Sequence, residues 1–273
     1  MSLCNLLIHL TGDEKSDARL RFAVELARSH GARLTGVFAR IATQHQIGLV
    51  AEWPTADYSA AAATSRAAFA AASQGVEAEW LDLNRGAEAE ILPQLLDLSR
   101  HFDLLVLGQP RGDDPLTPHG LAEDLIVQSG RPALVLPAVG AFAQVGTRPV
   151  FAWSDSRSSA RGFADAMMLV AEGAEARVVG LSKPNDTRAI AYQRESLRLA
   201  VAHLAAHKIT ASPEQLALSE IGLMDALLNL AADHGADLLA IGAFGGGGYP
   251  LFSRGSGSRY MLKHMTLPVL FSH

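Results

Sequence analysis

A glycine-rich run between a predicted strand and a predicted helix is the most informative part of this chain. It reads GAFGGGGYPLFSRGSGS over residues 242–258. The apolar residues 238–241 before it predict a buried strand, and residues 259–265 after it predict a short helix. Glycine tolerates positive φ, so the amides of such a loop can turn inward, and the start of a helix adds unpaired N–H donors. The run therefore predicts an anion site, and nucleotide phosphate is the expected ligand.

Length and composition limit the class of protein. A chain of 273 residues can carry two domains, and 49% hydrophobic with 19% charged residues is typical of a globular protein. The net charge is −5, and no basic segment stands out, so nucleic acid is not an expected partner. The single cysteine, Cys4, excludes an intramolecular disulfide and a cysteine-based metal site.

The first residues and the overall hydrophobicity suggest where the protein resides. Residues 2–10 carry no basic region and no small-residue cleavage site, so they predict a first strand rather than a signal peptide. No stretch approaches the roughly 20 apolar residues that a membrane span needs. We therefore expect a cytoplasmic protein with no membrane partner.

Strands and helices are predicted to alternate along the whole chain. This alternation predicts an α/β fold with a parallel sheet covered by helices on both faces. Gly31 is a predicted C-cap, Asp57 a predicted N-cap, and residues 41–54 are expected to be irregular. The strands are expected at 6–10, 34–39, 76–83, 103–108, 132–137, 150–154, 177–181, 215–218, 237–242 and 268–271, and helices at 16–30, 57–73, 87–100, 156–172, 187–208 and 223–234, with one more after residue 108.

The second half of the sequence repeats the first. HFDLLVLG at 101–108 matches HGADLLAIG at 234–242, and RPALV at 131–135 matches LPVLF at 267–271. Asp103 and Asp237 are 134 residues apart, and Pro132 and Pro268 are 136 apart. A nearly constant offset of this length indicates duplication of a whole domain. The expected domains are residues 1–140 and 147–273, with the linker within 138–147.

The glycine spacing resembles a known signature. Gly242, two residues, Gly245, nine residues and the pair Gly255-Ser256, followed by a closing strand from Pro268, resemble the ATP-binding motif of the universal stress protein family. The resemblance covers essentially the whole chain as two tandem domains. It implies an adenine nucleotide alpha hydrolase-like fold in which each domain is a five-stranded parallel sheet of order 3-2-1-4-5 flanked by helices. Family members commonly dimerise through the last strand, so the resemblance also implies an internal pseudo-dimer.

The resemblance implies a function for the C-terminal domain. We expect a nucleotide-binding regulatory protein of the stress response that binds ATP, with or without magnesium, and hydrolyses it slowly at most. Gly242 would avoid crowding a ribose, Gly245 would let the backbone pass close to the phosphates, and Arg254 would add charge. The expected nucleotide-binding residues are Gly242, Gly245, Gly246, Arg254, Gly255, Ser256, Gly257 and Ser258 at the phosphate end, and Ser154, Asp155 and Val179 at the adenosine end.

Both halves depart from the family pattern. The family's aspartate at the end of its first strand is replaced by Thr11 in the first half and by Ser154 in the second, with Asp155 one place further on. The first half's loop, GQPRGDDPLTPHGL at 108–121, has three prolines without amide donors, two adjacent aspartates and no Gly-Ser pair. We expect this half to bind no ATP and its own loop to close the pocket. A different small ligand, held by Arg111 and His119, stays open as an alternative.

Other chemistry is weakly indicated. His203 and His207 lie one helical turn apart, which is more often a solvated face than a metal site. The chain has no Gly-x-Ser-x-Gly, His-Glu-x-x-His or Walker motif, so no catalytic or metal residue is expected. An interaction module that has lost nucleotide binding is the second hypothesis, and an adenylate-transferring enzyme is a less favoured third. A further homodimer and an unidentified protein partner stay open.

Overall fold

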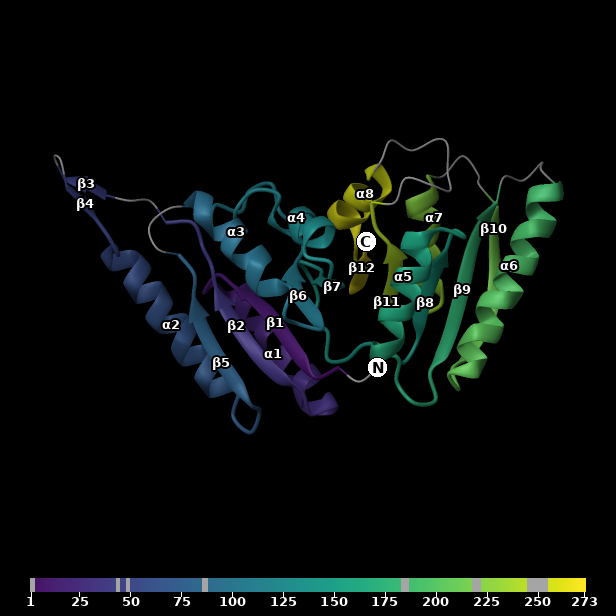
Figure 1. Cartoon of the computed structure of the whole chain (residues 1–273), viewed down its shortest axis with the longest axis horizontal. Helices are drawn as coiled ribbons and strands as arrows, with labels where there is room; N and C mark the ends of the chain where they lie inside the picture. Colours follow the sequence, from purple (N-terminus) through teal and green to yellow (C-terminus); the bar gives the residue numbers. More distant parts are fainter. Residues whose placement is uncertain are drawn as a thin grey trace. The chain divides into compact units, whose positions relative to one another are not determined.

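The computed structural model describes residues 3–42, 45–47, 50–84, 88–182, 187–217, 222–244 and 255–273 (Figure 1). The chain divides into two compact units, Ser2–Ala143 and Gln144–His273. Each unit contributes five parallel strands with helices packed on them, so the predicted α/β class is confirmed.

The first unit contains one five-stranded parallel arrangement. Its strands follow the order β5-β2-β1-β6-β7, which is 3-2-1-4-5 when its long strands are counted along the chain. A short antiparallel hairpin, β3 with β4, lies in the segment that was expected to be irregular, so that expectation was wrong. The elements are β1 (Asn5–Leu10), α1 (Glu14–His30), β2 (Arg33–Phe38), β3 (His45–Ile47), β4 (Val50–Glu52), α2 (Ala56–Ala72), β5 (Ala78–Asp82), α3 (Glu88–Ser99), β6 (Leu104–Gly108), α4 (Leu121–Gln128) and β7 (Ala133–Leu136).

The second unit has the same strand order. Its strands run β10-β9-β8-β11-β12, all parallel, so the predicted order 3-2-1-4-5 is confirmed here too. The helix expected over 156–172 ends earlier, and the strand expected at 215–218 begins earlier. The elements are β8 (Pro149–Trp153), α5 (Arg157–Ala166) with a 3-10 turn (Met167–Leu169), β9 (Glu175–Ser182), α6 (Thr187–Ala206), β10 (Thr210–Ala217), α7 (Leu223–Asp233), β11 (Leu238–Gly242), α8 (Ser256–His264) and β12 (Val269–Ser272).

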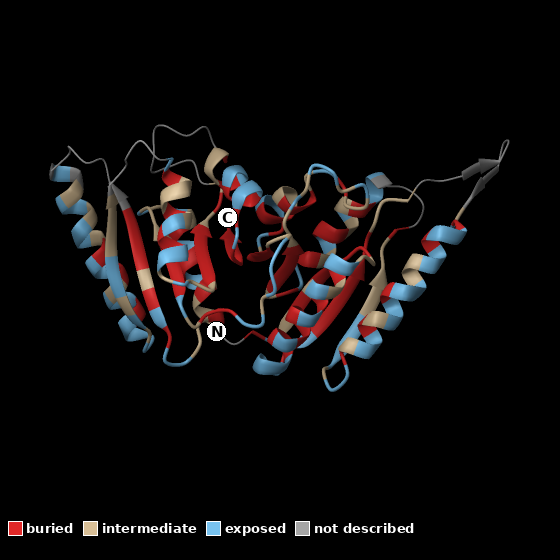
Figure 2. Cartoon of the chain, turned by 180° about the vertical axis from the view of Figure 1, so that it is seen from behind, coloured by how far each residue is buried: buried red, intermediate tan, exposed pale blue. Residues whose placement is uncertain are grey.

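The central strands hold the core of each unit. Figure 2 shows the inner strands buried and the outer helix faces exposed. From β1 the chain leads to β2 on one side, and from β6 it leads to β7 on the other, so the strand order reverses between β1 and β6. The second unit reverses in the same way between β8 and β11. In open α/β sheets, ligands bind at the carboxyl ends of the strands at such a switch point.

The repeated aspartates make the same contact in both units. Asp103 accepts hydrogen bonds from the amides of Cys4 and Asn5, both at 2.9 Å. The carboxylate of Asp237 accepts from the Thr147 amide at 2.7 Å, from the Thr147 hydroxyl at 2.6 Å and from the Arg148 amide at 3.0 Å. Each aspartate therefore ties the chain entering the fourth strand of its unit to the start of the first strand.

The helix ends follow local sequence, with one exception. Asp13 caps α1 by accepting from the Ser16 amide, and Gly31 ends that helix in the left-handed conformation, as predicted. Thr55, not Asp57, caps α2, because its hydroxyl accepts from the Tyr58 amide and the helix begins at Ala56.

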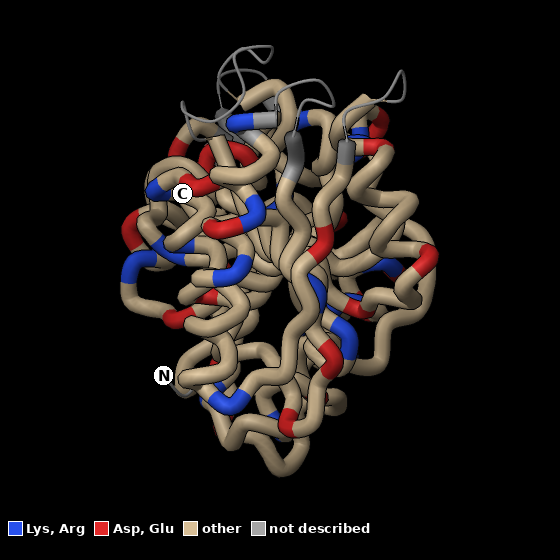
Figure 3. The backbone as a smooth tube through the Cα atoms, turned by 90° about the vertical axis from the view of Figure 1, so that its right-hand side faces the viewer, with Lys and Arg blue, Asp and Glu red and all other residues tan. Residues whose placement is uncertain are grey.

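Charge and apolar length characterise the described surface and helices. Acidic and basic residues are interspersed on the side shown in Figure 3, without a continuous basic stripe. Among the helices of the described residues, none is long and apolar enough to cross a membrane.

Candidate functional site

The end of β11 in the second unit is shaped by the helix beside it. A Cβ added to Gly242 would lie 2.4 Å from the carbonyl carbon of Ser158 and 2.4 Å from the amide nitrogen of Ser159. Gly162 is less tightly constrained, because a Cβ there would lie 3.0 Å from the Ile241 carbonyl oxygen. The close approach of α5 is therefore sufficient by itself to require glycine at 242.

The start of α8 has no side-chain cap among the described residues. Gly255 is its N-cap with φ 83°, and no side chain caps the helix. A Cβ at Gly255 would lie 2.6 Å from Cδ1 of Phe244, so only glycine fits. The hydroxyl of Ser256 is buried and has no hydrogen-bond partner among the described residues. Ser258 is already engaged, because its hydroxyl oxygen accepts from the Phe244 amide at 2.9 Å.

Two residues next to these strand ends adopt an uncommon backbone conformation. Asp155 follows β8 with φ 55°, and Phe244 follows β11 with φ 49°. Non-glycine residues at positive φ are uncommon and gather at functional sites. The carboxylate of Asp155 accepts a hydrogen bond from Tyr192, and this bond raises the pKa of the tyrosine.

A chain of serine hydroxyls begins α5 and was missed from the sequence. Ser154 is bonded to Ser156 at 3.0 Å, and Ser156 to Ser158 at 3.2 Å. Ser156 also caps α5 by accepting from the Ser159 amide. The many serines over 154–159 were the sequence signal for this cluster. Because residue 242 is a glycine, the start of α5 can lie directly against the end of β11.

The remaining expected residues are placed less favourably or lie outside the description. Val179 lies within β9, opposite Ala152, and its side chain is fully buried. Its side chain therefore lies in the core. Gly257 has only the Met224 side chain near its Cβ position, at 3.7 Å. Gly245, Gly246 and Arg254 lie outside the described residues.

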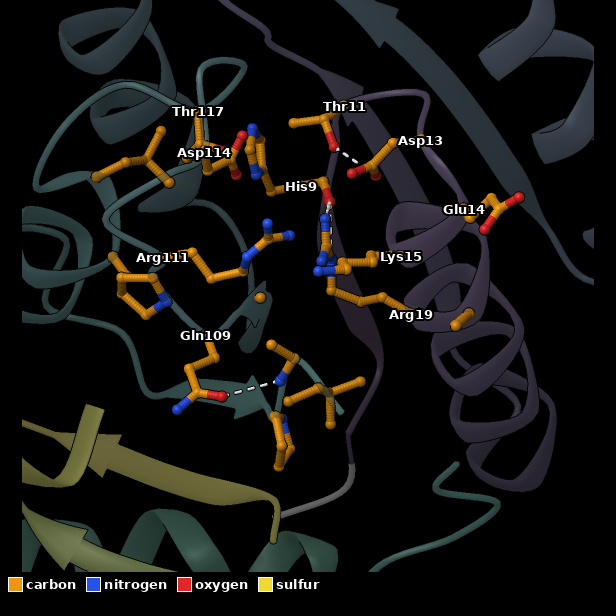
Figure 4. Close-up of a pocket in the computed structure, with 18 of the residues that line it drawn as sticks. His9, Thr11, Asp13, Glu14, Lys15, Arg19, Gln109, Arg111, Asp114 and Thr117 are labelled. Carbon is orange, nitrogen blue, oxygen red and sulfur yellow. Dashed lines mark hydrogen bonds between the residues drawn. The ribbon is translucent and has the colours of Figure 1, made fainter. Parts of the chain in front are cut away.

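The first unit contains a cavity at its own switch point (Figure 4). Its volume is about 710 Å³, so the expectation that the loop closes this pocket was wrong. Arg111 and His119, the two residues named as alternative ligand contacts, both line it. The other walls are the end of β1, one side of α1, the start of α4 and residues 136–138 and 140–143.

Buried His9 and half-buried Arg19, neither predicted from the sequence, lie side by side in this cavity. Arg19 donates from Nε and Nη2 to the carbonyl oxygen of His9, at 3.1 and 2.9 Å. Burial lowers the pKa of Arg19 to about 10, so it stays charged at neutral pH. The His9 Nε2 lies 2.8 Å from the carbonyl oxygen of Ala39 and donates to it, which leaves Nδ1 as the acceptor. Burial, and then the charge of Arg19, lower the pKa of His9 to about 4, so it is neutral.

The loop after β6 is held by its own polar contacts. Arg111 pairs with Asp113 through two hydrogen bonds, both 3.1 Å. Asp114 accepts from the Leu116 amide and the Thr117 hydroxyl. Figure 4 shows Arg111 reaching from this loop toward Arg19 and Lys15 of α1.

The first unit also retains part of the glycine signature. Gly120 caps α4 in the left-handed conformation, with φ 75° and no side-chain cap, as Gly255 does for α8. Arg111 stands three residues after Gly108, the place that Gly245 holds after Gly242. The loop therefore keeps its first and last glycines and carries an arginine in place of the middle one.

Comparisons with known proteins show the fold. No protein-family model matches the chain, and no curated protein sequence is similar to it. A universal stress protein from Archaeoglobus fulgidus has a similar structure, with a TM-score of 0.68 and 14% identity over 98% of this chain and 97% of that one. A functionally unknown protein from Pseudomonas aeruginosa PAO1 matches with a TM-score of 0.59 and 14% identity over 99% of this chain and 92% of that one. A provisionally assigned universal stress protein from Pseudomonas aeruginosa UCBPP-PA14 also has a TM-score of 0.59, with 14% identity over 99% of this chain and 93% of that one. The chain therefore has the fold of a tandem universal stress protein.

Proposed function

We propose that this protein is a nucleotide-binding regulator of the stress response that holds ATP, or a related adenine nucleotide, in its second unit. The start of α8 carries the proposal. Gly255 leaves the first turn without a side-chain cap, and the buried Ser256 hydroxyl has no partner among the described residues. Unpaired amides at the positive end of a helix dipole stabilise phosphate. The residue types present at this end of the site therefore fit a phosphate group.

Two helix starts meet at the same short segment, and this supports the proposal. The first turn of α5 reaches Gly242, and the first turn of α8 reaches Phe244 through Ser258. A ligand over residues 242–244 would lie close to both helix N-termini and to the hydroxyls of Ser156 and Ser158. In this proposal Gly245, Gly246 and Arg254 complete the phosphate end, as the family resemblance implies.

The adenosine end is assigned to Ser154 and Asp155. Gly180 of β9 lies under the Gln193 side chain of α6, because a Cβ on this glycine would be 3.0 Å from that side chain. A base at the switch point would therefore lie nearer to Asp155 and Tyr192 than to Val179. The described residues include no group of three His, Cys, Asp or Glu that could hold a metal, so magnesium would be bound together with the phosphates.

One observation favours the second hypothesis, an interaction module without nucleotide. The backbone of α5 fills the space above Gly242, and the Ser258 hydroxyl is already bonded to Phe244. Under this hypothesis the glycines only allow the helices to pack closely, and the uncapped start of α8 binds no phosphate.

Titration of the full chain with a fluorescent ATP analogue separates the two hypotheses. We expect saturable binding in the micromolar to low millimolar range and a loss of about tenfold to a hundredfold in affinity for Ser256→Ala, which is the effect of removing one hydrogen bond to a charged group. Ser59→Ala, an exposed serine of α2, is the matched control and should bind as the unaltered protein does. No binding at millimolar concentration, or binding equal in all three proteins, would overturn the nucleotide assignment.

A further inference from the structure

The cavity of the first unit has the size and composition of a ligand site. Pockets for small molecules usually measure about 300–1,000 Å³, and this one has a volume of about 710 Å³. All of its lining residues belong to the first unit, so it is formed without help from the second. The nucleotide proposal above does not use it.

The cavity contains an arginine that forms no ion pair with the described residues. Within 4.0 Å of the Arg19 guanidinium there is no carboxylate oxygen among these residues, and the guanidinium donates to the neutral carbonyl oxygen of His9, while Asp13 and Asp114 act on its charge from further away. A half-buried charge without a direct counter-ion is costly, so an anion in the cavity would be stabilised. Arg111 is paired, but its partner Asp113 is 76% exposed, and an exposed pair of this kind exchanges partners at little cost.

Four acidic residues line the cavity, namely Asp13, Glu14, Glu25 and Asp114, and two of them are engaged in hydrogen bonds close to the arginines. Asp13 accepts from the Ser16 amide and the Thr11 hydroxyl. Asp114 accepts from an amide and a hydroxyl within its own loop. Neither carboxylate forms a described ion pair with Arg19 or Arg111, although both remain close enough to lower the affinity of a ligand with several negative charges.

The start of α4 adds donors to the same cavity. Gly120, Leu121 and Ala122 line it, and Gly120 provides no side-chain cap, although the Leu121 amide already donates to the Pro118 carbonyl oxygen at 3.2 Å. The positive end of the helix dipole therefore faces the same space as Arg111.

Part of the remaining lining is apolar, although Lys15, Arg21 and Gln109 also belong to it. Ile41, Leu136 and Phe142 line the cavity together with several alanines and prolines. A ligand that fills it would therefore bring one anionic group to the arginines and an apolar body to these walls.

We propose that the first unit binds a small organic monoanion, namely a carboxylic acid with an apolar body, in the cavity between α1 and the loop after β6. Arg111 and Arg19 hold the carboxylate with the uncapped start of α4. The apolar body packs on Ile41, Leu136 and Phe142. The arginine that replaces the middle glycine of the signature thus changes the class of ligand from polyphosphate to carboxylate.

Calorimetric titration of the full chain with benzoate and octanoate tests this proposal. We expect saturable binding of at least one of them below about 10 mM, and binding of the neutral amide benzamide that is at least about tenfold weaker. Arg111→Gln should weaken binding of the acid about tenfold or more, since it removes a charge-assisted contact. Arg198→Gln is the matched control, because Arg198 also forms a two-bond pair with a nearby carboxylate but lies on α6.

The other results contradict the proposal in distinct ways. No binding of either acid, or equal binding of benzamide, overturns the recognition of a carboxylate. Binding of inorganic phosphate without binding of the acids indicates an oxyanion site with no apolar body. ATP that competes with benzoate shows that the cavity is a nucleotide site. Ser256→Ala should leave benzoate binding unchanged, so failure here and failure of the proposed nucleotide site can be told apart.

Discussion

Arg19 lies against Gly108 in the first unit, where a Cβ on the glycine would be 2.4 Å from Nη1 of the arginine. Asp13 and Ser156 cap the first helix of each unit and are 143 residues apart. By the same offset, Arg19 holds in the first unit the position that Gly162 holds in the second. Gly162 lets α5 lie directly on β11, whereas Arg19 puts a long, charged side chain between α1 and β6. This exchange explains why the first unit has a cavity at its switch point.

Substitution of the two strand-ending glycines should have unequal effects on stability. Gly242→Ala would push against the backbone of Ser158 and Ser159, so we expect the free energy of unfolding to fall by about 1–3 kcal/mol. Gly108→Ala would meet only the end of the flexible Arg19 side chain, and a smaller loss is expected. Urea unfolding of both variants checks this, with Gly112→Ala, which has open space around its Cβ, as the control. Equal losses at 108 and 242 would contradict the difference in packing.

The contacts of Asp237 should contribute strongly to the second unit. Asp237→Ala removes three hydrogen bonds to Thr147 and Arg148 and leaves amides without their partner. We expect the free energy of unfolding to fall by about 2–4 kcal/mol, measured by urea unfolding. The control is Asp233→Ala, an exposed residue at the end of α7, which should change stability little. A similar fall in the free energy of unfolding in both variants would show that the contacts of Asp237 add no particular stability.

Burial of His9 predicts a pH dependence of stability. The folded protein keeps His9 neutral down to its pKa of about 4, whereas the unfolded chain takes up a proton near pH 6.5. The unfolded state therefore binds more protons between about pH 6.5 and 4, so the contribution of neutral His9 is complete above this window and is lost as the pH falls through it. We expect a loss of roughly 3 kcal/mol from this group.

The variant His9→Gln isolates that contribution. Glutamine can still donate to the Ala39 carbonyl but does not titrate. The stability advantage of the unaltered protein over the variant should shrink as the pH is lowered from 7 to about 4. A difference that stays constant over this range would show that His9 is not held neutral.

Much of the fold could be predicted because its signals are local. Runs of apolar residues predicted the strands, the repeated aspartates predicted the duplication, and Gly31 predicted the end of α1. The strand order followed from the family resemblance. The hairpin of β3 and β4 was missed because its two strands are three residues each and have little apolar pattern. Thr55 was missed because Asp57, two residues later, is also a good capping residue.

The candidate sites were less predictable because they depend on how helices approach the sheet. The start of a helix at Gly255 and Ser256 could be predicted from spacing alone. Arg19 could not, since its role depends on its lying beside the end of β1 and β6. The available signal was its position one turn before Ala23, on the buried stripe of α1, where a charged residue is unexpected. The cavity was not foreseen because the prolines and aspartates of the loop suggested closure, whereas Arg19 and the loop's own hydrogen bonds leave an open space.

Amide hydrogen exchange with and without saturating ATP tests the central claim, which is that the nucleotide belongs to the second unit. We predict slower exchange in the presence of ATP at Phe244 and in the first turn of α8, Ser256 to Arg259, with no change in the first turn of α4 from Leu121. Protection at Gly108 to Ala122 instead, or no protection in either unit, would contradict it.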